Sequence, residues 1–197
     1  AQWIATRRDI FPPHVCDRLS VLHDRGIAHS WHHTDALMRH AFGDDYCERG
    51  LHIDPNDIIG VGSAAQVYKG TLLERNGQVR PVAVKVLHPR LEYRIGRDLW
   101  FVQTVAETLH SLPIRSLQML NLPRATSNFG SILQRQADLT IEADNLTQFR
   151  KNFYDHKKER DSAILFPQPM KGWVSEKVLV EDLVHNSTPI AEFINDS

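Results

Sequence analysis

A short glycine-rich segment followed by a lysine-bearing strand constrains the fold of this chain most strongly. Residues 60–70 read Gly-Val-Gly-Ser-Ala-Ala-Gln-Val-Tyr-Lys-Gly, and residues 81–86 read Pro-Val-Ala-Val-Lys-Val after a variable turn. Small residues let backbone N–H groups approach phosphate oxygens, and a lysine on the next strand adds a positive charge there. This order predicts an antiparallel hairpin that holds nucleotide phosphates.

The predicted phosphate loop departs from the protein-kinase pattern G-x-G-x-x-G-x-V at one position. Gly60, Gly62 and Val67 fit the pattern, whereas Ala65 stands in place of the third glycine. A methyl group restricts φ and takes up room beside the phosphates, so we expect a stiffer loop with altered nucleotide binding. The predicted loop residues are Gly60, Gly62, Ser63, Ala64, Ala65 and Val67.

The composition is typical of a globular protein with one or two hydrophobic cores. The 197 residues are 42% hydrophobic and 24% charged. A formal net charge of −1 gives no basic footprint, which argues against nucleic acid as a partner. Cys16 and Cys47 match no disulfide framework and no C-x-x-C pair, so we expect two reduced thiols.

No run of residues approaches the roughly 18 consecutive apolar residues of a membrane-spanning helix. No signal peptide precedes the first motif. The chain begins with Ala1 rather than methionine and ends at Ser197, where a new helix is predicted to begin. We therefore expect a partial chain.

Two short helices are predicted before the glycine-rich segment. Apolar residues recur at helical spacing over residues 13–24, with prolines before them and a glycine after them. A second helix is predicted from Thr34, as its N-cap, to Gly43. These helices indicate a helical extension over residues 1–55.

Hydrophobic periodicity predicts three strands, then helices, then two strands. The first three strands are expected at residues 58–61, 66–72 and 81–88, with Asn76-Gly77 as a hairpin turn. A helix with an apolar stripe formed by Leu99, Val102, Val105, Ala106 and Leu109 is predicted to end at Pro113, and another helical region covers about 123–154. The final strands are expected at residues 163–166 and 173–184.

Lys85 requires a negatively charged partner if its strand is buried. Alternation places Ala83 and Lys85 on one face of the strand and the neighbouring valines on the other. Because an unpaired buried ammonium is costly, we expect Glu142, on a predicted downstream helix, to pair with it. The alternatives are a Lys85 that reaches solvent from an edge strand and a Glu142 on a solvated helix surface.

Three further residues are candidates near a nucleotide. Asp138 lies one helical turn before Glu142, so both carboxylates are expected on one helix face, either as part of a metal–phosphate site or as a solvated stripe. Glu181 follows an apolar run where a hinge would offer backbone groups to adenine, and Val184 completes that predicted hinge. No special role is expected for the Glu181 side chain.

Histidines and a charged helix end suggest weaker alternatives. We expect His29, His32, His33 and His40 to be exposed loop or helix residues, with metal binding as the less favoured interpretation because no metal-ligand spacing is present. The charged segment at 150–160 predicts a solvated helix end, with an anionic membrane surface as the alternative.

Taken together, these motifs resemble the UbiB-like atypical kinases, also called aarF-domain-containing or ADCK-type kinases. Residues 1–12 resemble the end of the family's K-x-G-Q region and its R-x-D-x-x-P segment. Residues 62–68 resemble its alanine-containing nucleotide loop, and residues 82–85 its lysine strand. Residues 138–146 resemble its E-x-D…E-A-x-N helix, and the whole is closest to the mitochondrial ADCK-two-like branch and its fungal relatives.

The resemblance implies an α+β fold: a protein-kinase-like small lobe, with a five-stranded antiparallel sheet plus helices, after an N-terminal helical extension. The extension would cover residues 1–55, the small lobe with inserted helices 56–185, and the start of an otherwise absent large lobe 186–197. Lys85 would contact the α- and β-phosphates and pair with Glu142, and Asp138 would belong to the acidic motif. The N-terminal helices would fold over the nucleotide cleft.

The resemblance also implies ATP and Mg²⁺ as cofactors of the full-length protein, a mitochondrial location, and links to coenzyme Q or lipid metabolism. Membranes or lipids and coenzyme Q biosynthesis proteins would be its partners. Gln136 replaces the first glutamate of the acidic motif, and neither H-x-D-x-x-x-x-N nor D-F-G occurs in the chain, so no catalytic or metal-binding residue is assigned. We expect the segment alone not to transfer phosphate.

Two alternatives remain at the level of the sequence. One is a non-enzymatic pseudokinase scaffold or regulatory module, in which nucleotide binding at Lys85 switches a partner surface. The other is an ordinary protein kinase, which would have glycine at position 65 and no helical extension before Gly60.

Overall fold

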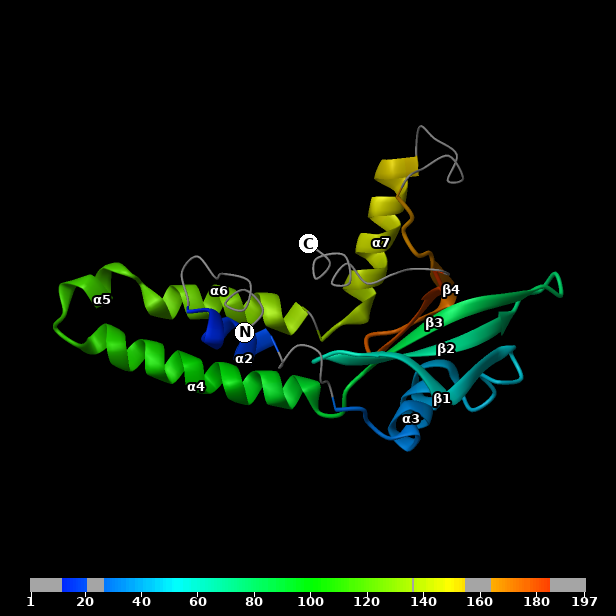
Figure 1. Cartoon of the computed structure of the whole chain (residues 1–197), viewed down its shortest axis with the longest axis horizontal. Helices are drawn as coiled ribbons and strands as arrows, with labels where there is room; N and C mark the ends of the chain where they lie inside the picture. The colour runs from blue at the N-terminus through cyan, green and yellow to red at the C-terminus, as the bar shows by residue number, and fades with distance from the viewer. Residues whose placement is uncertain (1–11, 21–26, 136, 155–163, 185–197) are drawn as a thin grey trace.

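The computed structural model describes residues 12–20, 27–135, 137–154 and 164–184. Its centre is a five-stranded antiparallel sheet with the strand order β1-β2-β3-β5-β4, and helices lie on both faces (Figure 1). The strands are β1 (Leu51–Val61), β2 (Ala65–Leu73), β3 (Val79–Leu87), β4 (Pro169–Val174) and β5 (Val178–Asp182). The helices are α2 (Pro13–Ser20), α3 (Trp31–Phe42), α4 (Leu91–Ser111), α5 (Arg115–Met119), α6 (Leu122–Arg135) and α7 (Leu139–Tyr154). The predicted α+β fold with a five-stranded antiparallel sheet is confirmed.

The β2–β3 hairpin forms around the predicted Asn76-Gly77 turn. Gly77 has a φ of +80°, a conformation that glycine adopts without a steric penalty. Glu74 donates its backbone N–H to the carbonyl of Gln78 at 2.8 Å, which closes the turn. The strands then pair without interruption from Leu73 opposite Val79 to Ala65 opposite Leu87.

Strand β1 begins earlier than the sequence pattern predicts. It starts at Leu51 instead of residue 58, because the polar segment 54–57, which includes Pro55, interrupts the alternation but is accommodated as an irregularity in the strand. The pairing shifts between Ile53 and Ile58. Gly70 makes the close approach possible, since a Cβ there would lie 2.7 Å from the carbonyl oxygen of His52.

The C-terminal strands are also placed differently. The described part of the predicted strand at 163–166 is not a strand, because Phe166 packs against Phe149 and Phe153 of α7 instead. The run predicted as a single strand at 173–184 turns after Val174: the N–H of Ser175 donates to the carbonyl of Val178 at 2.8 Å. Two antiparallel strands, β4 and β5, result.

The helical region predicted over 123–154 is two helices, α6 and α7. The carboxylate of Asp138 accepts a hydrogen bond from the N–H of Thr140 at 2.9 Å and so caps the start of α7. Asp138 therefore caps α7 and does not lie within it.

The first two helices also depart from their predicted ends. Helix α3 starts at Trp31 after Ser30, so Thr34 is not its N-cap. Thr34 is instead a buried residue of the first helical turns. Helix α2 covers the first part of the helix predicted at 13–24, and residues 21–24 lie outside the described residues.

Helices α4 and α6 lie side by side and extend away from the sheet, with α5 at their far end (Figure 1). They approach closely at Gly130, where a Cβ would lie 3.3 Å from the Leu99 side chain. The predicted stripe on α4 is only partly covered, since Ala106 is buried but Val102 and Val105 are each 41% exposed. Among the described helices, none combines the length and apolar character needed to cross a membrane.

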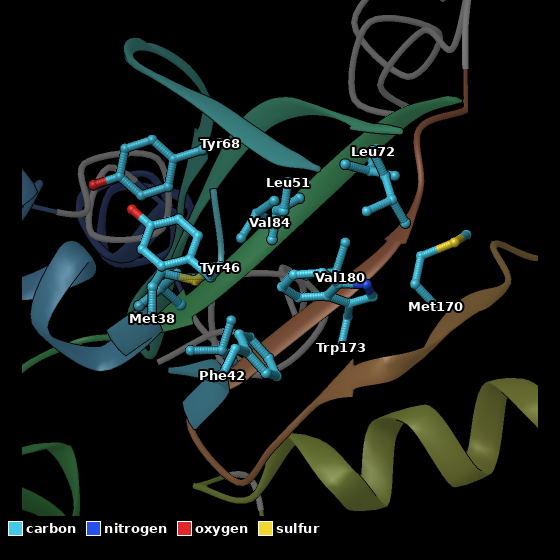
Figure 2. Packing of buried hydrophobic residues seen from close by; sticks show 13 residues of the cluster. Met38, Phe42, Tyr46, Leu51, Tyr68, Leu72, Val84, Met170, Trp173 and Val180 are labelled. Carbon is cyan, nitrogen blue, oxygen red and sulfur yellow. The ribbon is translucent and has the colours of Figure 1, made fainter. Parts of the chain in front are cut away.

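Two hydrophobic clusters cover opposite faces of the sheet. The larger lies between the sheet and α3 and includes the β3 valines with Phe42, Tyr46 and Trp173. Figure 2 shows Val84 of β3 among its members. The smaller lies against α7 and includes Leu139, Ala143 and Leu179. Each fully buried side chain of this size stabilises the fold by about 1.5–3 kcal/mol. Because the β3 valines occupy the α3 face, Lys85 faces α7, as the alternation predicts.

Candidate functional site

Lys85 and Glu142 form an ion pair on the α7 face of the sheet. The Lys85 Nζ lies 2.7 Å from Oε1 and 2.6 Å from Oε2 of Glu142. Their side chains are 27% and 39% exposed, respectively, so the pair is open to solvent from one side. Strand β3 lies inside the sheet, between β2 and β5, and is not an edge strand. The predicted pairing is confirmed, and both alternatives to it are wrong.

The start of α7 is fixed so that Glu142 points at Lys85. The N–H of Leu139 donates to the carbonyl of Glu176, in the β4–β5 turn, at 2.9 Å. Leu139 and Ala143 are buried against the sheet, which holds the helix by its apolar side. Glu142 lies in the first turn of α7, where the partial positive charge of the helix end favours a carboxylate.

A cleft of about 590 Å³ opens beside this ion pair, a volume suited to a small-molecule ligand. It lies between the end of the β1–β2 hairpin and the junction of α6 and α7. Its lining residues are Ala64, Ala65, Lys85, Leu87, Ile132, Arg135, Asp138, Leu139, Ile141, Glu142 and Asn145.

Five of the predicted site residues line the cleft: Ala64, Ala65, Lys85, Asp138 and Glu142. Val67 and Ala83 lie on the same face of the sheet as Lys85, since Val67 is directly opposite Lys85 in the β2–β3 pair. Glu181 is opposite Ala83 on β5, and Val184 follows that strand. Gly60, Gly62 and Ser63 belong to the hairpin end but do not line the cleft.

A backbone hydrogen bond closes the end of the β1–β2 hairpin. The N–H of Gly62 donates to the carbonyl of Ala65 at 2.9 Å. Ala65 is only 6% exposed, and its methyl group packs with Leu87 and Leu179 in the smaller cluster. Among the described residues, a Cβ at Gly60 would meet nothing within 4 Å.

Glu181 has an unusual electrostatic environment. Burial, and then the negative charge of Glu142, raise the pKa of the Glu181 carboxyl to about 7, although the charge of Lys85 partly offsets them. Its Oε2 atom is buried and has no hydrogen-bond partner among the described residues. The Glu181 carboxyl therefore has a strongly raised pKa, although the sequence predicted no special role for its side chain.

Arg135 is a cleft residue that the sequence interpretation missed. It is exposed at the end of α6, and within the described residues no ion pair neutralises it. The helical region predicted at 123–154 included no break, whereas in the structure α6 ends at Arg135 and α7 starts at Leu139. Among the described residues, the cleft therefore has two cations, and only Lys85 has an ion-pair partner.

A histidine cluster lies on the opposite, α3 face of the same hairpin end. The Nδ1 atoms of His29 and His88 are 2.8 Å apart, and the Nε2 of His88 lies 2.9 Å from the carbonyl oxygen of Gly62. His33 donates from Nε2 to the carbonyl of Leu87 at 3.1 Å. His29 and His33 are thus hydrogen-bonded and partly buried, so the prediction that they are exposed is wrong, whereas His32 and His40 are exposed.

Comparison of the chain with known proteins identifies the family to which it belongs. Residues 21–192 match the ABC1 atypical kinase-like domain. The chain belongs to the ABC1 atypical kinase-like family. The predicted resemblance to the UbiB-like kinases is confirmed, and the five-stranded sheet with its lysine and glycine-rich hairpin is the small lobe of this ABC1 domain.

Several ABC1 and UbiB relatives cover most of this chain. It is 34% identical over 98% of its length to the probable serine/threonine-protein kinase abkC of Dictyostelium discoideum, covering 26% of that protein. It is 31% identical over 98% of its length to a mitochondrial ABC1 family protein of Schizosaccharomyces pombe, covering 30% of it. The probable protein kinase UbiB of Erwinia tasmaniensis is 29% identical over 97% of the chain, which covers 33% of that relative. The chain thus spans about a quarter to a third of the length of these proteins.

Proposed function

We propose that the cleft beside Lys85 binds ATP and that this chain is the nucleotide-binding part of a longer ABC1 kinase or ATPase. The observation that carries the proposal is the Lys85–Glu142 ion pair facing the end of a glycine-rich hairpin. Glu142 holds the ammonium in place, and the ammonium can attract phosphate oxygens. Arg135 adds a second positive charge at the same cleft.

The side chains also fit a magnesium ion bound with the nucleotide. Mg²⁺ prefers oxygen ligands and is usually held by one or two carboxylates together with substrate phosphates. Asp138 uses Oδ1 to accept hydrogen bonds from the N–H and hydroxyl of Thr140, which leaves Oδ2 for a ligand. Asp138, through Oδ2, is the residue that would hold the ion together with the phosphates, and the ion would neutralise phosphate charge.

In this proposal, the hairpin residues contact the phosphates and the β3–β5 face contacts the base. Gly60, Gly62, Ser63, Ala64 and Ala65 form the phosphate side. Val67 and Ala83 lie under the base, and the backbone near Glu181 and Val184 meets its edge. We expect the 197 residues alone to bind nucleotide without transferring phosphate, because the sequence has no H-x-D-x-x-x-x-N or D-F-G motif.

For the whole protein, we propose an ATP-dependent role in mitochondria, in coenzyme Q production or related lipid metabolism. The mitochondrial designation of the fungal ABC1 relatives and the similarity to proteins named UbiB support this proposal. Lipids and proteins of coenzyme Q biosynthesis are the partners we propose.

The decisive experiment is a titration of ATP and ADP, with and without Mg²⁺, into the full protein by calorimetry. Lys85→Met keeps the aliphatic stem and removes the charge, so it should weaken ATP binding by at least about tenfold. Lys69→Met, at an exposed lysine of β2, is the matched control and should leave binding unchanged. No binding by the wild type, or equal binding by Lys85→Met, would refute the proposal. Binding without any turnover would support the pseudokinase scaffold.

A further inference from the structure

The histidine cluster on the α3 face is part of a continuous chain of hydrogen bonds in which the donor of each bond is determined. The chain runs from the Tyr68 hydroxyl through Thr34 and His29 to His88 and ends at the carbonyl of Gly62. Its four contacts are between 2.8 and 2.9 Å. It connects the start of α3 and the segment before it to the hairpin end that faces the cleft.

A carbonyl oxygen can only accept, so the Nε2 atom of His88 must carry the hydrogen that bonds to Gly62. With both rings neutral, the Nδ1 atom of His88 then accepts a hydrogen bond from the Nδ1–H of His29. Burial, and to a smaller extent the proximity of the His88 and His33 rings, lowers the pKa of His29 to about 4, which supports a neutral His29 ring.

The same count of protons determines the donors of the remaining hydrogen bonds. The Nε2 atom of neutral His29 has a free lone pair and accepts from the Thr34 hydroxyl. Since the single hydroxyl proton of Thr34 is then used, the Tyr68 hydroxyl donates to Thr34. Every donor in the chain has one acceptor, and no proton is left over.

The last bond of this chain orients a peptide group of the hairpin end. The carbonyl of Gly62 belongs to the peptide bond with Ser63, and in a trans peptide the N–H points opposite to the C=O. Holding the Gly62 oxygen against His88, on the α3 face, therefore turns the Ser63 N–H away from that face. His88 also donates its own backbone N–H to the carbonyl of Ala64 at 2.9 Å. One residue thus fixes two carbonyls of the segment 62–64.

The segment before α3 is held in the same way. The backbone N–H of His29 donates to Oε1 of Gln66, a fully buried side chain of β2. His33, in the first turn of α3, donates to the carbonyl of Leu87, next to His88. A shift of residues 29–33 would therefore move or break the bonds that hold His88 in place.

We propose that His88 and His29 are positioning residues for the phosphate loop, and that the segment 29–34 thereby sets the nucleotide affinity of the cleft on the other face of the sheet. His88 acts directly, by orienting the Gly62–Ser63 peptide so that its N–H is presented to a phosphate. The His29 ring acts through His88, since the direct bond of His29 to the hairpin is the backbone N–H bond to Gln66, and His29 does not line the cleft. The effect on affinity rests on the proposed function, whereas the orientation of the loop does not.

The test measures hydrogen exchange of peptides covering residues 62–65 in the full protein without nucleotide, and ATP affinity by titration. His88→Phe keeps a ring of similar size and removes the donor, so exchange should speed up and ATP affinity should fall by about three- to tenfold. His88→Gln retains a side-chain N–H donor, so it should restore part of the slow exchange and part of the ATP affinity. His29→Phe should change both quantities in the same direction by a smaller factor. His32→Phe, at an exposed position of α3, is the matched control and should change neither.

The outcomes separate this inference from the proposed function. Unchanged loop exchange in folded His88→Phe and His29→Phe would overturn the positioning role, even if the wild type binds ATP. Faster loop exchange in a protein that binds no nucleotide would support the positioning role and refute the proposed function. If His88→Phe does not fold, His29→Phe decides the question, and unchanged loop exchange in that variant overturns the inference.

Discussion

The two faces of the sheet use the same strands for different purposes. On the α3 face, Val82, Val84 and Val86 are fully buried in an apolar cluster. The residues between these valines, Ala83 and Lys85, face α7, and Lys85 lines a cleft with charged walls. The apolar face supplies most of the stability, which lets the other face keep a solvent-accessible ion pair whose own contribution to stability is small. The predictions below test this division, beginning with the largest expected effect.

The apolar face should dominate the free energy of unfolding. Leu51→Ala removes a side chain with no exposed surface, so it should lower that free energy by about 3 kcal/mol. The loss should be the same at low and high salt, because no charge is involved. Urea denaturation at both salt concentrations measures it. A loss below about 1 kcal/mol would contradict the assignment of the main core to this face.

Glu181 should destabilise the α7 face when it is ionised. Its folded-state pKa of about 7 lies above its usual value of 4.5, so the folded protein binds a proton that the unfolded chain releases between these values. The penalty is absent below pH 4.5 and complete above pH 7. Glu181→Gln should therefore stabilise the protein by on the order of 2 kcal/mol at pH 8 and leave it unchanged near pH 4.

Denaturation curves at the two pH values provide the measurement for Glu181. Glu176→Gln, at an exposed position of the β4–β5 turn, is the control and should show no such difference. Equal stabilisation at pH 4 and pH 8 would show that ionisation of Glu181 is not the cause.

The Lys85–Glu142 ion pair should matter less for stability than the core does. Glu142→Gln should cost about 1 kcal/mol, since both side chains are partly exposed to solvent. Raising the salt concentration should shrink the difference between variant and wild type, in contrast to the behaviour of Leu51→Ala. A salt-independent loss of several kcal/mol would mean that the pair acts as a buried one.

The smallest expected effect concerns Arg135. Arg135→Ala should weaken ATP binding by about threefold and leave the melting temperature unchanged, because within the described residues the side chain has no ion-pair partner to lose. Arg124→Ala, on the same helix but outside the cleft, is the matched control. Equal ATP affinities for the two variants would remove Arg135 from the proposed site.

The features that depend on residues close in sequence could be predicted: the orientation of Lys85 and the β2–β3 hairpin. Period-two alternation placed Lys85 opposite the valines, and the cost of an unpaired ammonium required a carboxylate partner, which is Glu142. The Asn76-Gly77 turn and the uninterrupted β2–β3 pairing followed from turn chemistry.

The remaining features depend on contacts between segments that are distant in sequence. Nothing local to His29 indicates that it meets His88, 59 residues away. Phe166 was expected in a strand because of its apolar neighbours, but stacking on Phe149 determines its place. The position of Arg135 depends on the helix break that Asp138 caps, and a helical period that continues across the break conceals it.

Both edges of the sheet are irregular. Pairing shifts between Ile53 and Ile58 on β1, where Pro55 lies, and between Pro169 and Val174 on β4, where Gly172 has a φ of +82°. A straight edge strand offers an unbroken row of N–H and C=O groups that a strand of another molecule can join. The bulges and prolines interrupt that row on each side, so the sheet is protected against growing by addition of a neighbouring molecule and hence against aggregation.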